Sequence, residues 1–436
     1  MSENPLNKMK FHQYIYFLCG QLGIMILARF FFQWVVDFAN TTPSSGSSDL
    51  LFATVAFGSL ILAFRVFDGI TDPICGMVSD KWVSSGKSRK KLLPLFLTLP
   101  VIGLCLFFYI NPSMSTNLRW ILAIVSMMVW YVGYTFYCIP YWSLVDDYSK
   151  GSEQERRRLS NLLGLGMMLA TAIGFVITPI LIGKYGYFYT IVILGIPSLI
   201  LMYLPVIAEP ESRSFQSTGE SVPSLFNSLK VALSHKRFIA LLAAYGGFQM
   251  AQTVMTSIAP FLTIHMLGGE TKDVAKVLGP LLIFSIPTFI FTPKISQKVG
   301  WEKAIIYAAF AIGGTFCAAG FLGSVNFMSP MLAAMILFAL AGPMVAIIQG
   351  TEGEAVVDCA NEKGNDLVSM YFGGLNFIVK ILNGLALFIT NALVGKFKES
   401  NDPVYIQYMC FTAGGCAILG VIVYLGLKLK GKKSKA

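Results

Sequence analysis

Charged residues are scarce in this chain of 436 residues, of which 13% are charged and 55% apolar. So little charge excludes an ordinary soluble domain, and the mean hydropathy of +0.66 agrees with that. The eight cysteines fall mostly inside apolar segments and show neither CxxC nor CxxxH spacing. We therefore expect no disulfides and no zinc site.

Residues that carry enzymatic chemistry are also missing from the apolar segments. The three histidines, His12, His235 and His265, lie at or beyond the ends of these segments, and the sequence has no serine elbow and no phosphate loop. The net charge of +10 comes from basic residues spread among loops without an aromatic platform between them. We therefore expect no enzyme, no organic cofactor and no nucleic-acid partner.

Long apolar runs are what the sequence has in abundance, and windows of about 20 such residues are long enough to cross a bilayer as helices. These windows are 12–36, 50–80, 92–111, 118–146, 159–183, 187–207, 238–267, 275–296, 302–323, 328–351, 366–396 and 403–429. The pattern predicts an all-α, multi-pass integral protein with twelve transmembrane helices, in an inner or plasma membrane.

Basic residues give the orientation of these spans. Most of the 33 lysines and arginines lie in the amino-terminal segment, in the loops on the same side and in the tail. Because such residues collect on the cytoplasmic side, both termini are predicted to be cytoplasmic. We expect the lipid bilayer and a small-molecule substrate as partners, and a monomer by analogy with similar folds.

A polar, charge-mixed stretch divides the chain near its middle. This predicted connector covers 208–236, with six spans in an amino-terminal half (1–207) and six in a carboxy-terminal half (237–436). The 6+6 arrangement resembles the major facilitator architecture, in which two similar halves rock about a central site. A repeated loop supports it, since GMVSDK at 76–81 with GKSRKK at 86–91 has a degenerate copy, SQKVGWEK, at 296–303.

Two acids inside the second span are the main functional signal. Arg65, Asp68 and Asp72 have i, i+3, i+7 spacing, which places them on one helix face. Intramembrane acids are costly and indicate function by default, here a cation or proton site. A buried ion-pair cluster that only docks two helices is the alternative.

Three strings resemble the glycoside-pentoside-hexuronide:cation symporter family, to which the melibiose permease belongs. They are RVFDGITDPICG at 65–76, YTFYCIPYWSL at 134–144, and the stretch from Asp358 to the intramembrane Lys380. With the twelve spans and the central loop, the resemblance covers essentially the whole chain. It implies a secondary transporter that works by alternating access and couples a cation to a small organic solute.

The resemblance implies a cation site at Asp68, Asp72, Thr71 and Thr135. Carboxylate and hydroxyl oxygens suit sodium or lithium, and a carboxylate pair can hold a proton instead. The site is thus for a monovalent cation, and the sequence leaves open which ion it is. Thr135 as a helix-packing hydroxyl is the alternative.

The resemblance also implies substrate contacts. Trp142 matches a tryptophan that stacks on the sugar, although an interface anchor is an alternative. Lys380 matches a lysine near the acids and the substrate. Met25, Cys138 and Gly164 stand where well-known members have two acids and an arginine, and this loss of polar partners argues against a simple galactoside such as melibiose.

Other polar side chains lie in the apolar spans. They are Gln21, Arg29, Gln33, Gln249, Gln252, Gln349, Asn376 and Asn383. We take Arg29, Gln252, Gln349 and Asn376 as further candidates for substrate contact, with Cys138 from the fourth span. The partner of Arg29 is left open among Asp37, another helix and an anionic substrate.

Three functions are consistent with these residues. The first is a cation-coupled symporter for a glycoside, hexuronide or related carbohydrate. The second is transport of a lysolipid or another amphipathic solute, since Met25, Met250, Met255 and the phenylalanines would give an apolar cavity. The third is an uncoupled facilitator, or a scaffold that does not transport. A scaffold would leave the paired acids and Lys380 unexplained.

Overall fold

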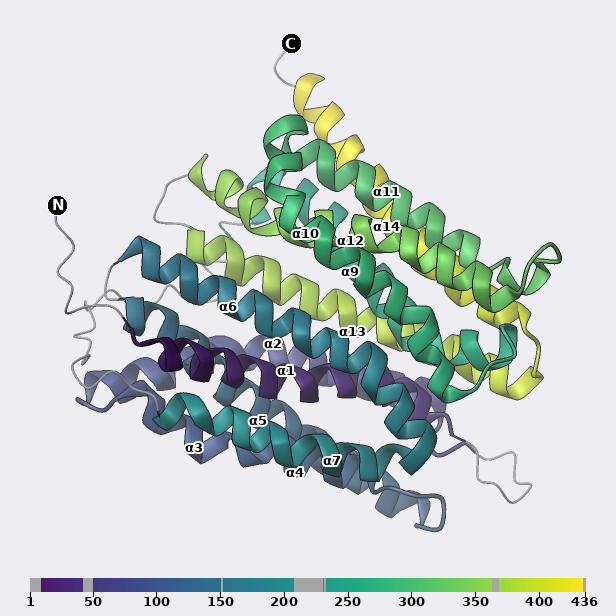
Figure 1. Ribbon diagram of the computed structural model, residues 1–436, viewed down its shortest axis with the longest axis horizontal. Coiled ribbons are helices and arrows are strands. Elements are labelled where there is room, and N and C mark those ends of the chain that lie inside the picture. The colour runs from purple at the N-terminus through teal and green to yellow at the C-terminus, as the bar shows by residue number, and fades with distance from the viewer. Residues whose placement is uncertain are drawn as a thin grey trace. The chain divides into compact units, whose positions relative to one another are not determined.

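The computed structural model describes residues 9–41, 50–149, 152–207, 230, 233–362 and 368–433. Within these ranges the regular structure is helical and no strand occurs (Figure 1). Apolar runs must satisfy their backbone hydrogen bonds internally in a bilayer, and a helix does so within a single segment. The all-α fold expected from the sequence is confirmed.

The helices follow the apolar windows closely. The first part of the chain forms α1 (Phe11–Ala39), α2 (Thr54–Ser84), η2 (Arg89–Leu92), α3 (Leu93–Phe96), α4 (Thr98–Phe108), α5 (Thr116–Ser149), α6 (Glu153–Ala172), η3 (Ile173–Ile177) and α7 (Thr178–Ile207). The second part forms α9 (Lys236–Phe261), η4 (Leu262–Met266), η5 (Thr271–Asp273), α10 (Val274–Val299), α11 (Trp301–Ala319), η6 (Leu322–Ser324), α12 (Pro330–Asn361), α13 (Val368–Ser400) and α14 (Val404–Lys433).

Eleven helices among the described residues are long and apolar enough to cross a membrane. One of them, Gln154–Ile207, has 54 residues, about twice what a single crossing needs. Its helical geometry breaks at Gly186, where φ is 76° and ψ 175°, a conformation that glycine adopts without strain. The break separates the predicted windows 159–183 and 187–207, so the observed helices are compatible with twelve spans.

The contacts divide the chain into two compact units, and each is described by itself. Unit 1 consists of residues 1–31, 70–174 and 184–222, and unit 2 of residues 32–69, 175–183 and 223–436. Of the predicted connector 208–236, only residue 230 and residues 233–236 lie within the described part of the chain. The division into two six-helix halves stays a prediction.

Helices α1, α5 and α7 meet in unit 1 where glycine permits it. A Cβ on Gly20 would lie 2.5 Å from Pro205 Cγ and 2.7 Å from Tyr141 Cε2. The hydroxyl of Tyr137 donates a hydrogen bond of 2.8 Å to the carbonyl of Met202, so the buried tyrosine has its polar partner. The aromatic rings of Tyr137 and Tyr141 on α5 thus fill the space beside Gly20 on α1.

Unit 2 brings α2 against α13, and the residues in contact are more than 300 positions apart in sequence. A Cβ on Gly395 would lie 2.4 Å from Thr54 Oγ1, and one on Gly384 would lie 2.8 Å from Arg65 Cβ. Near the end of α1, Asn40 is 1% exposed and its amide donates a hydrogen bond of 2.7 Å to Asn391. The Asn40–Asn391 hydrogen bond also joins the end of α1 to α13. The close α2–α13 approach places side chains of α2, such as Arg65, beside α13.

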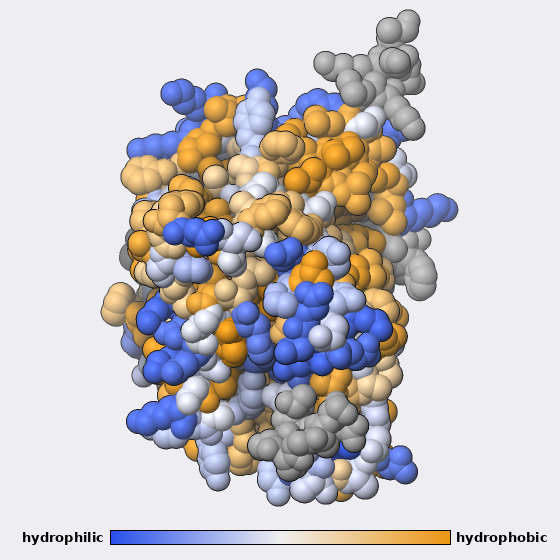
Figure 2. All heavy atoms as spheres, turned by 90° about the vertical axis from the view of Figure 1, so that its right-hand side faces the viewer, coloured by the Kyte–Doolittle hydropathy of each residue, from blue (hydrophilic) through white to orange (hydrophobic). Residues whose placement is uncertain are grey.

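Large apolar side chains remain exposed along helix flanks. On α10, Ile283, Phe284, Ile290 and Phe291 are each more than half exposed, and their spacing puts them on one face. Lipid is the medium that accepts such a face. Figure 2 shows the side of the molecule turned by 90° from the view of Figure 1, where hydrophilic and hydrophobic residues are interspersed.

Helix α14 packs through glycines on two neighbours in unit 2. A Cβ on Gly414 would lie 2.4 Å from the carbonyl oxygen of Gly313 on α11, and one on Gly420 would lie 2.4 Å from that of Ala243 on α9. Small residues at such crossings allow backbones to approach closely. A Cβ on the adjacent Gly415 would meet nothing within 4 Å.

These neighbouring glycines give a matched pair of variants. We expect Gly414→Ala to lower the free energy of unfolding by about 1–3 kcal/mol, because the methyl group overpacks the α11–α14 crossing. Gly415→Ala should leave stability almost unchanged. The measurement is the melting temperature of the detergent-purified protein, and equal melting temperatures for the two variants would contradict the close crossing.

Candidate functional site

The side chain of Asp68 has no solvent exposure and lies between two bases. The Nη1 atom of Arg65, one turn away on α2, is 3.1 Å from Asp68 Oδ2. The Nζ atom of Lys380 on α13 is 3.1 Å from Asp68 Oδ1 and 3.5 Å from the Asp68 carbonyl oxygen. All three residues belong to unit 2.

Local geometry places the two bases on one carboxylate. Gly384 follows Lys380 by one turn on α13, and its missing side chain lets α13 approach Arg65. The guanidinium of Arg65 lies over the ring of Phe32, 4.6 Å from the centroid, which adds a cation–π contact. The cluster therefore depends on the i, i+3 spacing of Arg65 and Asp68 on α2 and on the absence of a side chain at Gly384 on α13.

The three side chains together carry one more positive than negative formal charge. A buried charge is tolerated when it is paired and hydrogen-bonded, and Asp68 is paired twice. The contacts also dock α2 on α13, as the sequence alternative proposed. A cation that reaches Asp68 must compete with the ammonium group of Lys380 for the same carboxylate oxygen.

The other predicted cation ligands belong to unit 1. Asp72 lies one turn after Asp68 on α2 and is partly buried, whereas Thr71 and Thr135 are buried at 7% and 1% exposure. The carbonyl of Thr135 on α5 accepts a hydrogen bond from Cys75 Sγ on α2 at 3.6 Å. Helix α2 thus contacts α5 near these residues, and their role as cation ligands stays a prediction.

Trp142 on α5 is held by a residue of α1. Its indole nitrogen donates a hydrogen bond of 2.9 Å to Oε1 of Gln21, which is 2% exposed. The indole is therefore oriented by a buried partner within unit 1, which differs from an anchor at the membrane surface. Cys138, one turn earlier, is buried at 1% exposure, and Arg29 on α1 is partly buried.

A second polar cluster lies in unit 2 between α9 and α12. The amide of Gln349 donates a hydrogen bond of 3.1 Å to Gln252, which joins two of the predicted substrate contacts. Nearby, the hydroxyl of Tyr245 donates to Glu352 at 2.5 Å. Asn376, the remaining candidate of this unit, has an exposed side chain on α13.

The sequence analysis missed Tyr245 and Glu352. A signal was present, because Glu352 follows Gln349 by three residues, and Tyr245, Gln249 and Gln252 have i, i+4, i+7 spacing. Each set lies on one helix face. The two polar faces meet in the structure, and the carboxylate they share is the missed residue.

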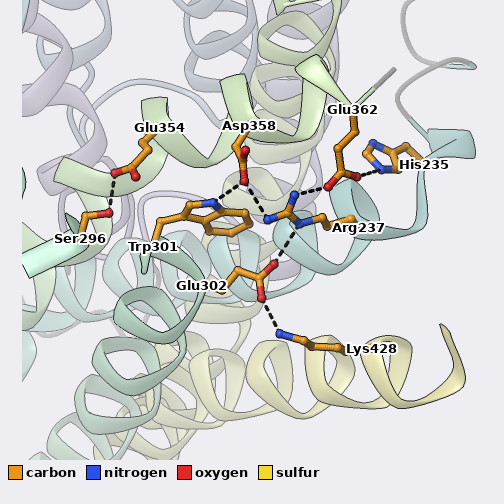
Figure 3. A network of polar contacts seen from close by, with 9 residues as sticks. All are labelled: His235, Arg237, Ser296, Trp301, Glu302, Glu354, Asp358, Glu362 and Lys428. Atoms are coloured by element: carbon orange, nitrogen blue, oxygen red, sulfur yellow. Dashed lines mark hydrogen bonds and ion pairs between the residues drawn. The ribbon is translucent and has the colours of Figure 1, made fainter. Parts of the chain in front are cut away.

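Arg237, at the start of α9, is the centre of an ionic network (Figure 3). Its guanidinium contacts Glu302 at 2.9 Å, Asp358 at 2.8 Å, and Glu362. The network ties the start of α11 and the end of α12 to α9, and Lys428 of α14 reaches the second oxygen of Glu302. The degenerate loop copy at 296–303 thus supplies an acid to an inter-helix ion pair.

The first copy of the loop motif behaves similarly within unit 1. Arg89 contacts Asp80, near the end of α2, at 2.8 Å and Asp147, near the end of α5, at 3.6 Å. The acid and base of the motif therefore join helix ends. Because Arg89 has two acidic partners, neither acid alone is indispensable for neutralising it.

The charges around Asp68 predict that the variant Asp68→Asn is less stable than Lys380→Met. Asp68→Asn removes the carboxylate that both bases contact and should cost about 3–5 kcal/mol, as expected when one partner of a buried pair is removed. Lys380→Met leaves the neutral Arg65–Asp68 pair and should cost less. Melting temperatures in detergent test this order. A Lys380→Met variant that is less stable than Asp68→Asn would show that the second base does not bind as described.

Comparison with known proteins agrees with the membrane fold. A family model described as MFS/sugar transport protein matches residues 47–427. The symporter YjmB of Bacillus subtilis (strain 168), which is uncharacterized, is 24% identical over 351 residues, covering 78% of this chain and 74% of YjmB. YagG of Escherichia coli (strain K12), named as a candidate glycoside/cation symporter, is 25% identical over 390 residues, covering 85% of this chain and 81% of YagG.

Solved structures show the same fold. The crystal structure of the nucleoside transporter NupG matches with a TM-score of 0.70 at 11% identity, over 95% of this chain and 98% of NupG. The family match covers most of the chain, and the relatives are transporters, not enzymes. The chain belongs to the MFS/sugar transport protein family and is a multi-pass membrane protein that acts as a secondary transporter.

Proposed function

We propose that the protein is a symporter that couples a monovalent cation to the uptake of a glycoside, hexuronide or related carbohydrate. The cation is bound by Asp68, Asp72, Thr71 and Thr135. The candidate substrate contacts are Trp142, Cys138, Lys380, Arg29, Gln252, Gln349 and Asn376. The description of the matched family and the name of YagG support a carbohydrate substrate.

The observation that carries the proposal is the fully buried carboxylate of Asp68 with Lys380 as its partner. An intramembrane acid costs free energy and indicates function by default. The second base makes the charge of the site depend on where the ammonium group lies. A cation on Asp68 would release Lys380 for a substrate oxygen, and this linkage must be reciprocal.

The tryptophan supports a sugar as the substrate. Its indole is oriented by Gln21, and a fixed aromatic face is what stacking on a sugar ring requires. A Cβ on Gly164 would meet nothing within 4 Å, so the position where well-known members of the resembled family have an arginine is open. The departures at Met25, Cys138 and Gly164 still argue against a simple galactoside.

A lysolipid substrate has less support from the structure. The proposed apolar lining includes Met25 at 4% and Met255 at 1% exposure, and only Met250 is partly exposed. Methionines that are already packed among helices offer little surface to an acyl chain. We therefore rank carbohydrate transport above lysolipid transport.

The cation site can be tested without knowing the substrate. We expect the melting temperature of the purified protein to rise and saturate with sodium or lithium chloride, but not with choline chloride, because a ligand stabilises the state that binds it. At a hundredfold excess over the dissociation constant, the gain is about 2.7 kcal/mol. Asp72→Asn should abolish the rise.

Asp80→Asn is the matched control, since it removes an acid of the same helix whose base keeps a second acidic partner. It should respond to the ions as the wild type does. A full response in Asp72→Asn would exclude Asp72 from the site. No response of the wild type to either metal ion would remove sodium and lithium from the proposal.

The substrate class is tested by the same measurement with a panel of methyl glycosides, hexuronides and lysophosphatidylcholine. A carbohydrate that stabilises the wild type should lose its effect in Trp142→Ala and keep part of it in Trp142→Phe, which retains an aromatic face. Trp120→Ala, on the same helix, is the control. Stabilisation by the lysolipid alone would favour the alternative substrate.

A further inference from the structure

We propose that Glu352 is a proton-binding site in the second part of the chain, separate from the acids of α2. It lies on α12, and its carboxylate receives a hydrogen bond from the hydroxyl of Tyr245 on α9 at 2.5 Å. Gln249, one turn after Tyr245, donates in turn to that hydroxyl at 2.7 Å. All three residues belong to unit 2.

The partners of this carboxylate are neutral. Within the described part of the chain, Glu352 makes no ion pair, and Tyr245 is its hydrogen-bond partner. The other acids towards the end of α12 differ. Asp358 and Glu362 contact Arg237, and Glu354 is exposed and accepts a hydrogen bond from Ser296 (Figure 3).

Charges on the elements packed against α12 are already engaged. Arg237 of α9 lies two turns before Tyr245, about 12 Å along the helix, and contacts three acids. Lys380 of α13 contacts Asp68, and Lys428 of α14 contacts Glu302 of α11. His235, which precedes α9, is bonded to Glu362 and to Tyr371 of α13.

The remaining neighbours of α12 supply no base to Glu352 either. On α10, hydroxyls of two residues meet this part of α12, and the Lys294 side chain between them is exposed, with its ammonium group 5.8 Å from the ring centroid of Phe291. The hydroxyl of Ser296 donates a hydrogen bond to Glu354. Thr292 Cγ2 lies 2.7 Å from the position that a Cβ on Gly350 would take. Helix η6 contributes only Leu322, Gly323 and Ser324. A charged Glu352 would therefore have no ion-pair partner among the described residues, only the hydroxyl of Tyr245.

A carboxyl group without a base has two ways to avoid a large cost in an apolar surrounding. It can carry a proton, or it can remain in contact with water. Glu352 is only partly buried, so a proton has a route to it. Tyr245 can donate to the charged form and accept from the protonated form, since a hydroxyl does both. The surroundings thus accommodate both protonation states.

A proton on Glu352 would add a charge-changing step that is independent of the cation proposed at Asp68 and Asp72. The proposal that Asp68 and Asp72 bind sodium or lithium can be right or wrong without any change in the contacts of Glu352. The test therefore reads the protonation state directly and does not depend on transport.

The experiment is infrared difference spectroscopy of the full-length protein in liposomes, titrated between about pH 6 and 8, where exposed carboxylates stay ionised. We expect a C=O band of a protonated carboxyl group that grows as the pH falls. Glu352→Gln should lack it, and Glu354→Gln, two residues along the same helix, should retain it. The absence of such a band in the wild type, or its persistence in Glu352→Gln, would overturn the proposal.

A second variant keeps the test valid if Glu352→Gln does not fold. Tyr245→Phe retains the carboxyl group and removes its hydrogen-bond partner, so the same band should shift in frequency. An unshifted band in Tyr245→Phe would assign the signal to a different carboxyl group and contradict the site.

Discussion

The cost of placing charge in an apolar medium governs where polar residues lie in this protein. A buried ion needs partners that replace its water. Asp68 has two bases, and Arg237 has three acids. Each cluster spans at least two helices. The charged clusters are therefore also the contacts that join helices distant in sequence, and ionisation and helix packing are coupled through them.

Close backbone approach is what lets these partners reach each other. Glycine at 384 allows α13 to lie against Arg65, and Lys380, one turn earlier, then reaches Asp68. A larger residue at 384 would move α13 away and lengthen the ion pair together with the packing contact. The hydrophobic effect does not draw helices together in lipid as it does in water, so such small-residue contacts and interhelical polar bonds carry much of the association.

Much of the fold was predictable because hydropathy reports span length directly. The acids of α2 were predictable too, since their i, i+3, i+7 spacing is local. The pairing of Asp68 with Lys380 spans 312 residues, and only the family resemblance pointed to Lys380. Glu352 was missed because it follows the apolar window 328–351, where an acid resembles an ordinary flanking charge. Its hydrogen-bond partner Tyr245 comes from α9, which hydropathy along α12 cannot reveal. The break at Gly186, by contrast, falls in the gap between the predicted windows 159–183 and 187–207.

Asp68 and Glu352 represent opposite solutions to the same electrostatic problem. Asp68 has no exposure and contacts two bases, so a further cation must compete with a base for its carboxylate. Glu352 is partly exposed and has a hydroxyl partner, so its charge is set by its own protonation. A site of the first kind selects for what can compete with an ammonium group, whereas a site of the second kind responds to pH. Two carboxylates in one unit can therefore respond to different ions, because their partners differ in charge while the acids themselves are chemically alike.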